Sequence, residues 1–200
     1  LWADPTVQMV MASCGGNYAT HMLPLIDWNA LRRTPKILMG FSDTTALLCA
    51  MYQQAGISGA FGPTVQSLGR IDTLPQVFDV ISGKRDVSVS LADSSILQDG
   101  VIHAPVFAAT LSLLMALAGT TYLPKLDGHI LLLEDTGEEL SHLDRYMWQL
   151  SQVIDISKLA GIVLGRIENI SDTGRPFGTP FESSLRYHTH GLNGPIVINA

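Results

Sequence analysis

The chain has 200 residues, of which 46% are hydrophobic and 15% are charged, with a formal net charge of −6 at pH 7. This composition is typical of a folded chain and excludes a disordered one. Because 18 acidic residues outnumber 12 basic ones, we expect neither nucleic acid nor an anionic membrane as a partner. The two cysteines, Cys14 and Cys49, are too few for a disulfide framework, so we expect a reducing, cytoplasmic compartment.

In the first part of the chain, predicted strands alternate with predicted helices. Glycines mark several of the junctions, among them Gly15-Gly16 after a strand and Gly56 after a helix. The expected elements are a strand at 7–12, a helix to about residue 26, a strand at 36–39, a helix at 43–54, a strand at 58–61 and a helix at 74–81. This alternation predicts an α/β lobe with a mainly parallel sheet and helices on both faces.

The second part is predicted to form another, smaller α/β lobe. Residues 84–100 are polar, with an alternating stretch at 87–91, and are interpreted as a linker between a domain at 1–83 and a domain at 101–200. The longest apolar stretch, 107–118, is too short and too interrupted for a bilayer span and favours a buried helix. The remaining expected elements are a strand at 130–133 closed by Glu134, a helix at 140–154 and strands at 162–164 and 195–200. The abrupt first and last residues suggest that both lobes are truncated.

Ser42 is the first candidate for chemistry, because it lies at the junction of a predicted buried strand and a predicted helix. A tight turn there exposes the hydroxyl at the carboxyl edge of the sheet and directs the following N–H groups toward an anion. Gly40 suits such a turn, although Thr44 stands where hydrolase elbows place a second glycine. The alternative is that Ser42 only caps the helix.

Two further positions are predicted to lie at sheet edges. Gly15-Gly16 would let a backbone N–H approach a developing oxyanion, and the alternative is an ordinary turn. Glu134 could orient a histidine as the third member of a triad, and the alternative is a solvated strand end. No histidine stands out as the base. His188 and His190 would share one face of an extended segment, but no third ligand is evident and we predict no metal site.

Several segments together resemble the serine LD-carboxypeptidase family, which removes D-amino acids from murein peptides and includes the microcin C self-immunity peptidases. The most specific signal is Gly40-Phe41-Ser42-Asp43 after Pro35-Lys36. The other matching segments are Asp4-Pro5 with Gly15-Gly16, Leu23-Pro24-Leu25-Ile26-Asp27, Gly62-Pro63, Gly119-Thr120 and Leu132-Leu133-Glu134-Asp135. The resemblance covers most of the chain.

The resemblance implies a class I glutamine amidotransferase-like first lobe and a serine peptidase with a Ser-His-Glu triad. Ser42 would be the nucleophile, Glu134 the carboxylate that orients the histidine, and the backbone N–H groups of Asp43 and Gly16 the oxyanion hole. The family pattern places the triad histidine beyond Ala200, so the 200 residues alone are expected to be inactive. It also implies a small peptide substrate, a role in peptidoglycan recycling, a homodimer, and no metal or organic cofactor.

Two departures from the family pattern leave the substrate open. Cys14 stands before the glycine pair, where many members of the family have arginine. The immunity-type branch also tends to lack this arginine. Residues 107–112 replace the family's Gly-Gly-Asn motif. The alternatives are therefore a microcin C immunity-type peptidase that cleaves a nucleotide-like amide, and an inactive binding module of the same fold. Arg32, Arg70 and Arg145 are candidates for holding the substrate carboxylate.

Overall fold

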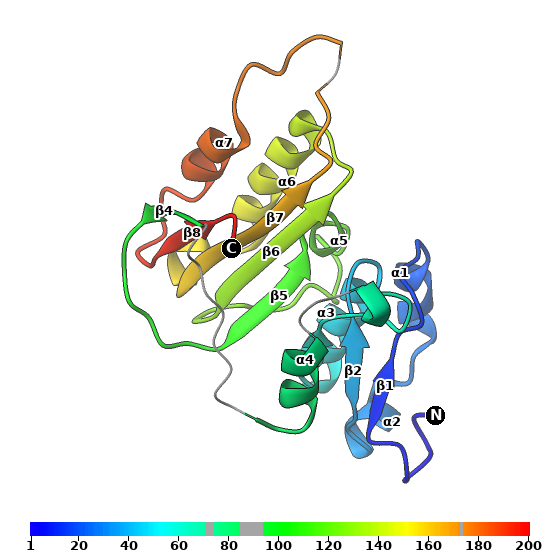
Figure 1. Cartoon of the computed structure of the whole chain (residues 1–200). Coiled ribbons are helices and arrows are strands. Elements are labelled where there is room, and N and C mark those ends of the chain that lie inside the picture. Colours follow the sequence, from blue (N-terminus) through cyan, green and yellow to red (C-terminus); the bar gives the residue numbers. More distant parts are fainter. Residues whose placement is uncertain (71–73, 85–93, 173) are drawn as a thin grey trace. The chain divides into compact units, whose positions relative to one another are not determined.

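The structure is a computed structural model that describes residues 1–70, 74–84, 94–172 and 174–200 (Figure 1). The chain divides into two compact units, Leu1–Ala92 and Asp93–Ala200, and each contains a sheet with helices packed on it. The α/β class predicted from the sequence is confirmed.

The first unit is built on three parallel strands in the order β1-β2-β3. Its elements are β1 (Met9–Met11), α1 (Ala19–Met22), a 3-10 turn (Leu23–Leu25), α2 (Trp28–Arg33), β2 (Ile37–Gly40), α3 (Thr44–Ala55), β3 (Ala60–Phe61), a second 3-10 turn (Leu68–Arg70) and α4 (Leu74–Ile81). The helix predicted at 74–81 is confirmed in both bounds. Because the strands are parallel, the segments after β1, β2 and β3 emerge at the same edge of the sheet.

The most buried element of the first unit is α3, which follows β2 directly. Ala46, Cys49 and Ala50 have no exposed surface, and small side chains of this kind let the helix lie close to the sheet. The helix ends at Gly56, whose φ of +68° is the left-handed conformation that favours glycine. One side of α3 contributes Leu48 and Met51 to an apolar cluster with Trp28 of α2. The strand and helix on either side of Ser42 are thus fixed by core packing.

The second unit contains a five-stranded sheet in the order β4-β8-β7-β6-β5, in which only β4 is antiparallel to its neighbour. Figure 1 shows β5, β6 and β7 side by side, coloured from green to orange. The elements are β4 (Ser95–Gln98), β5 (Val106–Thr110), α5 (Leu111–Met115), β6 (Ile130–Thr136), α6 (Leu140–Val153), a 3-10 turn (Ile156–Lys158), β7 (Gly161–Glu168), α7 (Phe181–His188) and β8 (Ile196–Ile198). With five strands against three, this sheet is not the smaller one, contrary to expectation.

The sequence-based expectations for individual elements need four corrections. The apolar stretch 107–118 is not one helix, because its first part forms β5 and pairs with β6. The helix expected to run to residue 26 is broken into α1 and a 3-10 turn at Pro24. Part of the predicted linker 84–100 is β4, which pairs with β8, while the stretch 87–91 lies outside the described residues. Two helices, α2 and α7, were not predicted.

The helices of the described residues include none with the length and apolar character that crossing a bilayer requires.

Candidate active site

Ser42 is the middle residue of the three-residue connection between β2 and α3 and has a φ of +56°. A non-glycine residue rarely adopts this left-handed conformation, and it costs about 1–3 kcal/mol that the surrounding structure must offset. The residue that begins α3 as its N-cap is Asp43, so Ser42 is not the helix cap that the alternative interpretation expected. This strained turn from strand to helix has the geometry of a nucleophile elbow.

Gly40 makes this turn possible because the chain packs tightly around it. A methyl group at Gly40 would lie 2.8 Å from Thr44 Oγ1 and 3.0 Å from Ala12 Cβ. The first distance is shorter than real side chains show and the second is tight, so a side chain at residue 40 would require β1 or the first turn of α3 to shift. The sequence-based argument for a tight turn at Gly40 is consistent with these contacts.

The glycine pair after β1 lies directly against the turn that holds Ser42. A methyl group at Gly15 would lie 3.3 Å from Ser42 Oγ, and one at Gly16 would lie 3.0 Å from Asp43 Oδ2. Two segments that are 27 residues apart in the sequence are therefore in contact, as the common sheet edge predicts. This contact is the close backbone approach that a glycine allows.

The backbone at this edge is suited to bind an anion. Within the described part of the chain, no backbone carbonyl accepts a hydrogen bond from the N–H groups of Gly16 or Asp43. Beside them lies an open hollow of about 310 Å³, whose lining includes Cys14, Gly16 and Asp43. N–H groups without a backbone partner next to a serine hydroxyl are what an oxyanion hole requires.

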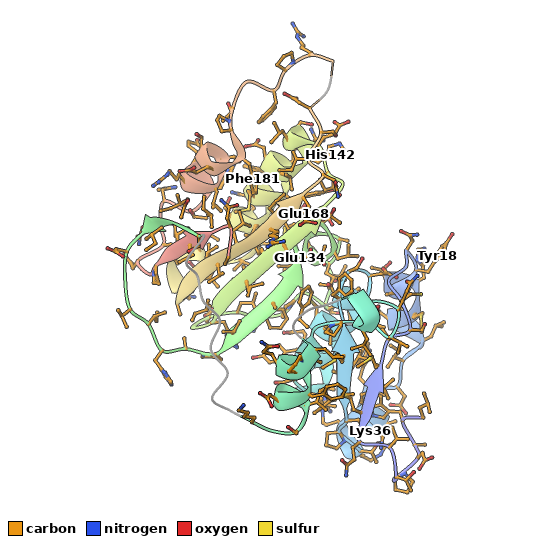
Figure 2. The ribbon with its side chains drawn as sticks, viewed as in Figure 1. Tyr18, Lys36, Glu134, His142, Glu168 and Phe181 are labelled. Carbon is orange, nitrogen blue, oxygen red and sulfur yellow. The ribbon has the colours of Figure 1, made fainter. Side chains whose placement is uncertain are left out.

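Glu134 lies inside β6 rather than at its end, because the strand continues to Thr136. Its side chain is half-buried and alternates with Leu133 and Asp135, which are buried on the opposite face. Figure 2 labels Glu134 on β6 and Glu168 on the neighbouring strand β7. The expectation that the strand closes at Glu134 is therefore wrong, as is the alternative of a solvated strand end, and the carboxylate is held within the sheet.

The environment of Glu134 shifts its pKa. Burial raises the pKa of this carboxyl above its usual value. A hydrogen bond from Thr110 Oγ1 to Glu134 Oε1, 2.5 Å long, lowers the pKa, and the charges of Asp135 and Glu168 raise it. Thr110 is itself buried at the end of β5. Sequence analysis did not assign Thr110 a role, since its partner is 24 residues away and only the pairing of β5 with β6 brings them together.

The neighbouring carboxylate, Asp135, has a structural role. It is only 3% exposed, and its Oδ2 accepts a hydrogen bond from the backbone N–H of Ser112 at 2.7 Å. Burial raises the pKa of Asp135, and the hydrogen bonds from Ser112 and Thr136 lower it. This contact ties the start of α5 to β6, so the segment that departs from the family's Gly-Gly-Asn pattern is held in place.

The histidines do not form a metal site in the described residues. His188 is the last residue of α7, not part of an extended segment, and its Nε2 lies 3.3 Å from Asp144 Oδ1. His190 Nδ1 lies 2.9 Å from the carbonyl of Tyr187 instead, so the two rings have different partners. The described residues contain no group of three or more His, Cys, Asp or Glu side chains suited to a metal ion.

The candidate arginines have the following places. Arg32 donates to Asn29 Oδ1 at 2.9 Å and to the carbonyl of Gln54. Arg145 is exposed on α6, and the side chain of Arg70 lies outside the described residues. Of the two free cysteines, Cys14 is exposed beside Gly15 and Cys49 is buried in α3, where burial raises its pKa to about 12.

Comparison with known proteins gives a consistent family. Residues 1–62 match the model of the LD-carboxypeptidase N-terminal domain, and residues 103–200 match that of the LD-carboxypeptidase C-terminal domain. The murein tetrapeptide carboxypeptidase of Pseudomonas aeruginosa is 32% identical over 183 residues, covering 80% of this chain and 56% of that protein. The microcin C7 self-immunity protein MccF of Escherichia coli is 26% identical over 212 residues, covering 87% of this chain and 61% of that protein.

A solved structure agrees with these sequence relatives. The muramoyltetrapeptide carboxypeptidase of Oxalobacter formigenes superposes with a TM-score of 0.77 at 26% identity, covering 97% of this chain and 67% of that one. The chain spans 56% and 61% of the two curated relatives named above. The matched domain models together cover most of the chain. The chain belongs to the LD-carboxypeptidase family.

Proposed function

We propose that this chain is part of a serine carboxypeptidase that hydrolyses the amide bond to a C-terminal D-amino acid in murein-derived peptides. The observation that carries the proposal is the backbone of Ser42, which holds a serine in a left-handed turn between strand and helix against Gly15. The structure keeps this strained conformation at the position where the family pattern has its nucleophile, and strain of this kind is concentrated at functional sites.

The reaction follows acyl-transfer chemistry. The Ser42 hydroxyl attacks the carbonyl carbon of the scissile amide while a histidine takes its proton, and the N–H groups of Asp43 and Gly16 stabilise the oxyanion. The histidine then gives the proton to the leaving amine, which departs as the free D-amino acid. Water hydrolyses the acyl-enzyme by the same steps. Glu134 holds the histidine in its working tautomer, and the family pattern places that histidine beyond Ala200.

The test is the release of D-alanine by the full-length protein. Purified enzyme is incubated with a murein tetrapeptide that ends in D-alanine and, as a control, with the same peptide ending in L-alanine. The proposal expects the enzyme to release the terminal alanine from the first peptide but not from the control peptide, and expects no release by the Ser42→Ala variant. Equal cleavage of both peptides, or undiminished cleavage by the variant, would contradict it.

A second candidate activity is the cleavage of an amide that joins an amino acid or peptide to a nucleotide-like group. It is favoured by the similarity to the microcin C7 self-immunity protein and by Cys14, which stands where many murein-cleaving members have arginine. An aminoacyl sulfamoyl adenosine offered beside the tetrapeptide separates the two activities. Cleavage of the adenosine compound alone would replace the first proposal. Cleavage of neither would favour a binding module.

We further propose, from the family resemblance, that the protein acts in the cytoplasm as a homodimer. The free cysteines, one of them exposed at Cys14, are compatible with a reducing compartment. Sedimentation of the full-length protein measures the assembly directly, and a monomeric mass at micromolar concentration would contradict it.

A further inference from the structure

The side chain of Asp43 is engaged with the glycine loop, not with its own helix. Although Asp43 is the N-cap residue of α3, its carboxylate makes no capping hydrogen bond to that helix. Instead Oδ2 accepts the backbone N–H groups of Tyr18 and Ala19, each at 3.0 Å. The side chain is buried, with 8% of the residue exposed, and both partners are about 25 residues away in the sequence. Figure 2 labels Tyr18, at the start of α1.

These two hydrogen bonds replace a cap that α1 lacks. The N-cap residue of α1 is Tyr18, and its side chain makes no capping hydrogen bond to the helix. The first N–H groups of a helix need an acceptor, and a carboxylate is a strong one because the bonds are charge-assisted. Asp43 therefore fixes the end of the loop 15–18 from outside the loop.

The same residue also touches the beginning of the loop. Gly16 packs so closely on Asp43 Oδ2 that an added methyl group would lie 3.0 Å from it. The neighbouring Gly15 packs in the same way on Ser42 Oγ. The Ser42-Asp43 pair thus lies against the loop at three places. The Ser42 hydroxyl lies next to Gly15, and the Asp43 carboxylate lies next to Gly16. The same carboxylate accepts the N–H groups of Tyr18 and Ala19 where the loop joins α1.

We infer that Asp43 is a positioning residue whose carboxylate clamps the loop 15–18 over Ser42. This inference rests on the proposed function, in which the N–H groups of Gly16 and Asp43 bind the oxyanion. One residue then sets both donors: its backbone provides the first, and its side chain fixes the loop that carries the second. The distance between the two donors is held by the clamp before substrate arrives, which is the preorganisation that oxyanion stabilisation depends on.

Two variants and a matched control test the clamp in the full-length protein. Asp43→Ala removes the acceptor, and Asp43→Asn keeps an oxygen acceptor without the charge. The control is Asp27→Ala, because the Asp27 side chain caps α2 by accepting from the Ala30 N–H at 2.9 Å, a contact outside the loop 15–18. Hydrogen exchange at the Tyr18 and Ala19 amides, kcat and KM are measured for all three.

For Asp43→Ala we expect exchange at Tyr18 and Ala19 to rise at least tenfold. We expect kcat to fall by about 100-fold, the usual cost of misplacing an oxyanion donor, with a much smaller change in KM. Asp43→Asn should recover most of kcat, because one amide oxygen can accept both N–H groups. Asp27→Ala should lower the melting temperature but leave kcat and the exchange of Tyr18 and Ala19 unchanged. If Asp43 had only a structural role, Asp43→Ala would show this same pattern.

Alkylation of Cys14 provides a readout that does not need catalysis. Cys14 is exposed next to the loop, whereas the high pKa and burial of Cys49 keep that thiol unreactive. Mass spectrometry of the peptide that contains Cys14 therefore measures how fast iodoacetamide modifies this thiol in the full-length protein. Asp43→Ala should change the alkylation rate at least threefold, and Asp27→Ala should not. Unchanged exchange and alkylation in Asp43→Ala would overturn the clamp, as would faster exchange with unchanged kcat.

The outcomes separate the clamp from the proposed function. If the unmodified enzyme cleaves neither substrate, the proposed function fails, and exchange and alkylation alone decide whether Asp43 holds the loop. If Asp43→Ala does not fold, the Asp43→Asn variant decides. The inference then requires near-normal exchange at Tyr18 and Ala19 and a kcat within about tenfold of the unmodified enzyme, because the amide oxygen weakens the hydrogen bonds without removing them.

Discussion

The two units hold their candidate groups by different means. In the first unit the backbone presents Ser42, through a left-handed turn that is packed between Gly40 and Gly15. In the second unit an extended strand presents Glu134, and a side-chain hydrogen bond from Thr110 holds the carboxylate. The first arrangement depends on residues having no side chain, whereas the second depends on side-chain chemistry. Substitutions should therefore act on the two units in different ways.

The largest expected effect is that of Ser42→Ala on turnover. A triad nucleophile accounts for roughly 10⁶-fold in kcat in comparable enzymes, and no other hydroxyl replaces it. Folding should be little affected, since Ser42 is not the cap of α3. Product release measured by chromatography should fall below detection, while the melting temperature stays within a few degrees. Residual turnover within tenfold of the unmodified enzyme would remove Ser42 from the mechanism.

Within the first unit, Gly15→Ala should be the next most damaging change. The added methyl group would lie 3.3 Å from Ser42 Oγ, so either the hydroxyl or the loop must move, and we expect kcat to fall by about 10- to 100-fold. Gly69→Ala is the matched control in the same unit, because nothing lies within 4 Å of a methyl group there. Steady-state kinetics of the two variants decide the matter, and equal values would show that the loop tolerates displacement.

Glu134→Gln should abolish most activity and raise stability. Burial and the charges of Asp135 and Glu168 raise the pKa of Glu134 in the folded protein. Ionising this carboxyl therefore costs more free energy in the folded chain than in the unfolded chain, and the ionised group lowers the free energy of unfolding. This penalty is absent below the unfolded pKa and is complete once the pH exceeds the folded pKa. The variant should therefore melt above the unmodified protein at pH 7, with an advantage that shrinks toward pH 4. A lower melting temperature at pH 7 would contradict the burial of the charge.

Thr110→Val should have the smallest effect, a shift in the pH profile. The hydrogen bond from Thr110 lowers the pKa of Glu134, so its loss raises that pKa further. Because the triad needs the ionised carboxylate, the acidic limb of the kcat/KM profile should move to higher pH while the rate on the plateau changes little. An unmoved acidic limb would show that the hydrogen bond does not control Glu134.

The sequence predicted the local parts of the site well. Gly40, Ser42 and Gly56 mark a strand, a turn and a helix, and the structure has β2, the left-handed Ser42 and α3 at those positions. Local conformational signals are sufficient there, since glycine and helix-forming residues act within a few positions. The roles of Ser42, Glu134, Asp43 and Gly16 in catalysis stay predictions.

Contacts between distant segments were not predictable from residue patterns. The apolar stretch 107–118 has no glycine or proline to mark where β5 ends and α5 begins, so the change of period was missed. The bond from Thr110 to Glu134 depends on the register of β5 against β6, and the bonds from Tyr18 and Ala19 to Asp43 depend on how the loop folds over α3. Such contacts are set by tertiary packing.

The most direct test of the account is to trap the acyl-enzyme. Full-length protein is mixed with the D-alanine-terminated tetrapeptide, quenched in acid within milliseconds to seconds, digested and analysed by mass spectrometry. We predict that the mass of the peptide minus its D-alanine is found on Ser42, and that the adduct disappears in Ser42→Ala. Product accumulation with the adduct on another residue, or with unchanged rate in Ser42→Ala, would contradict the account.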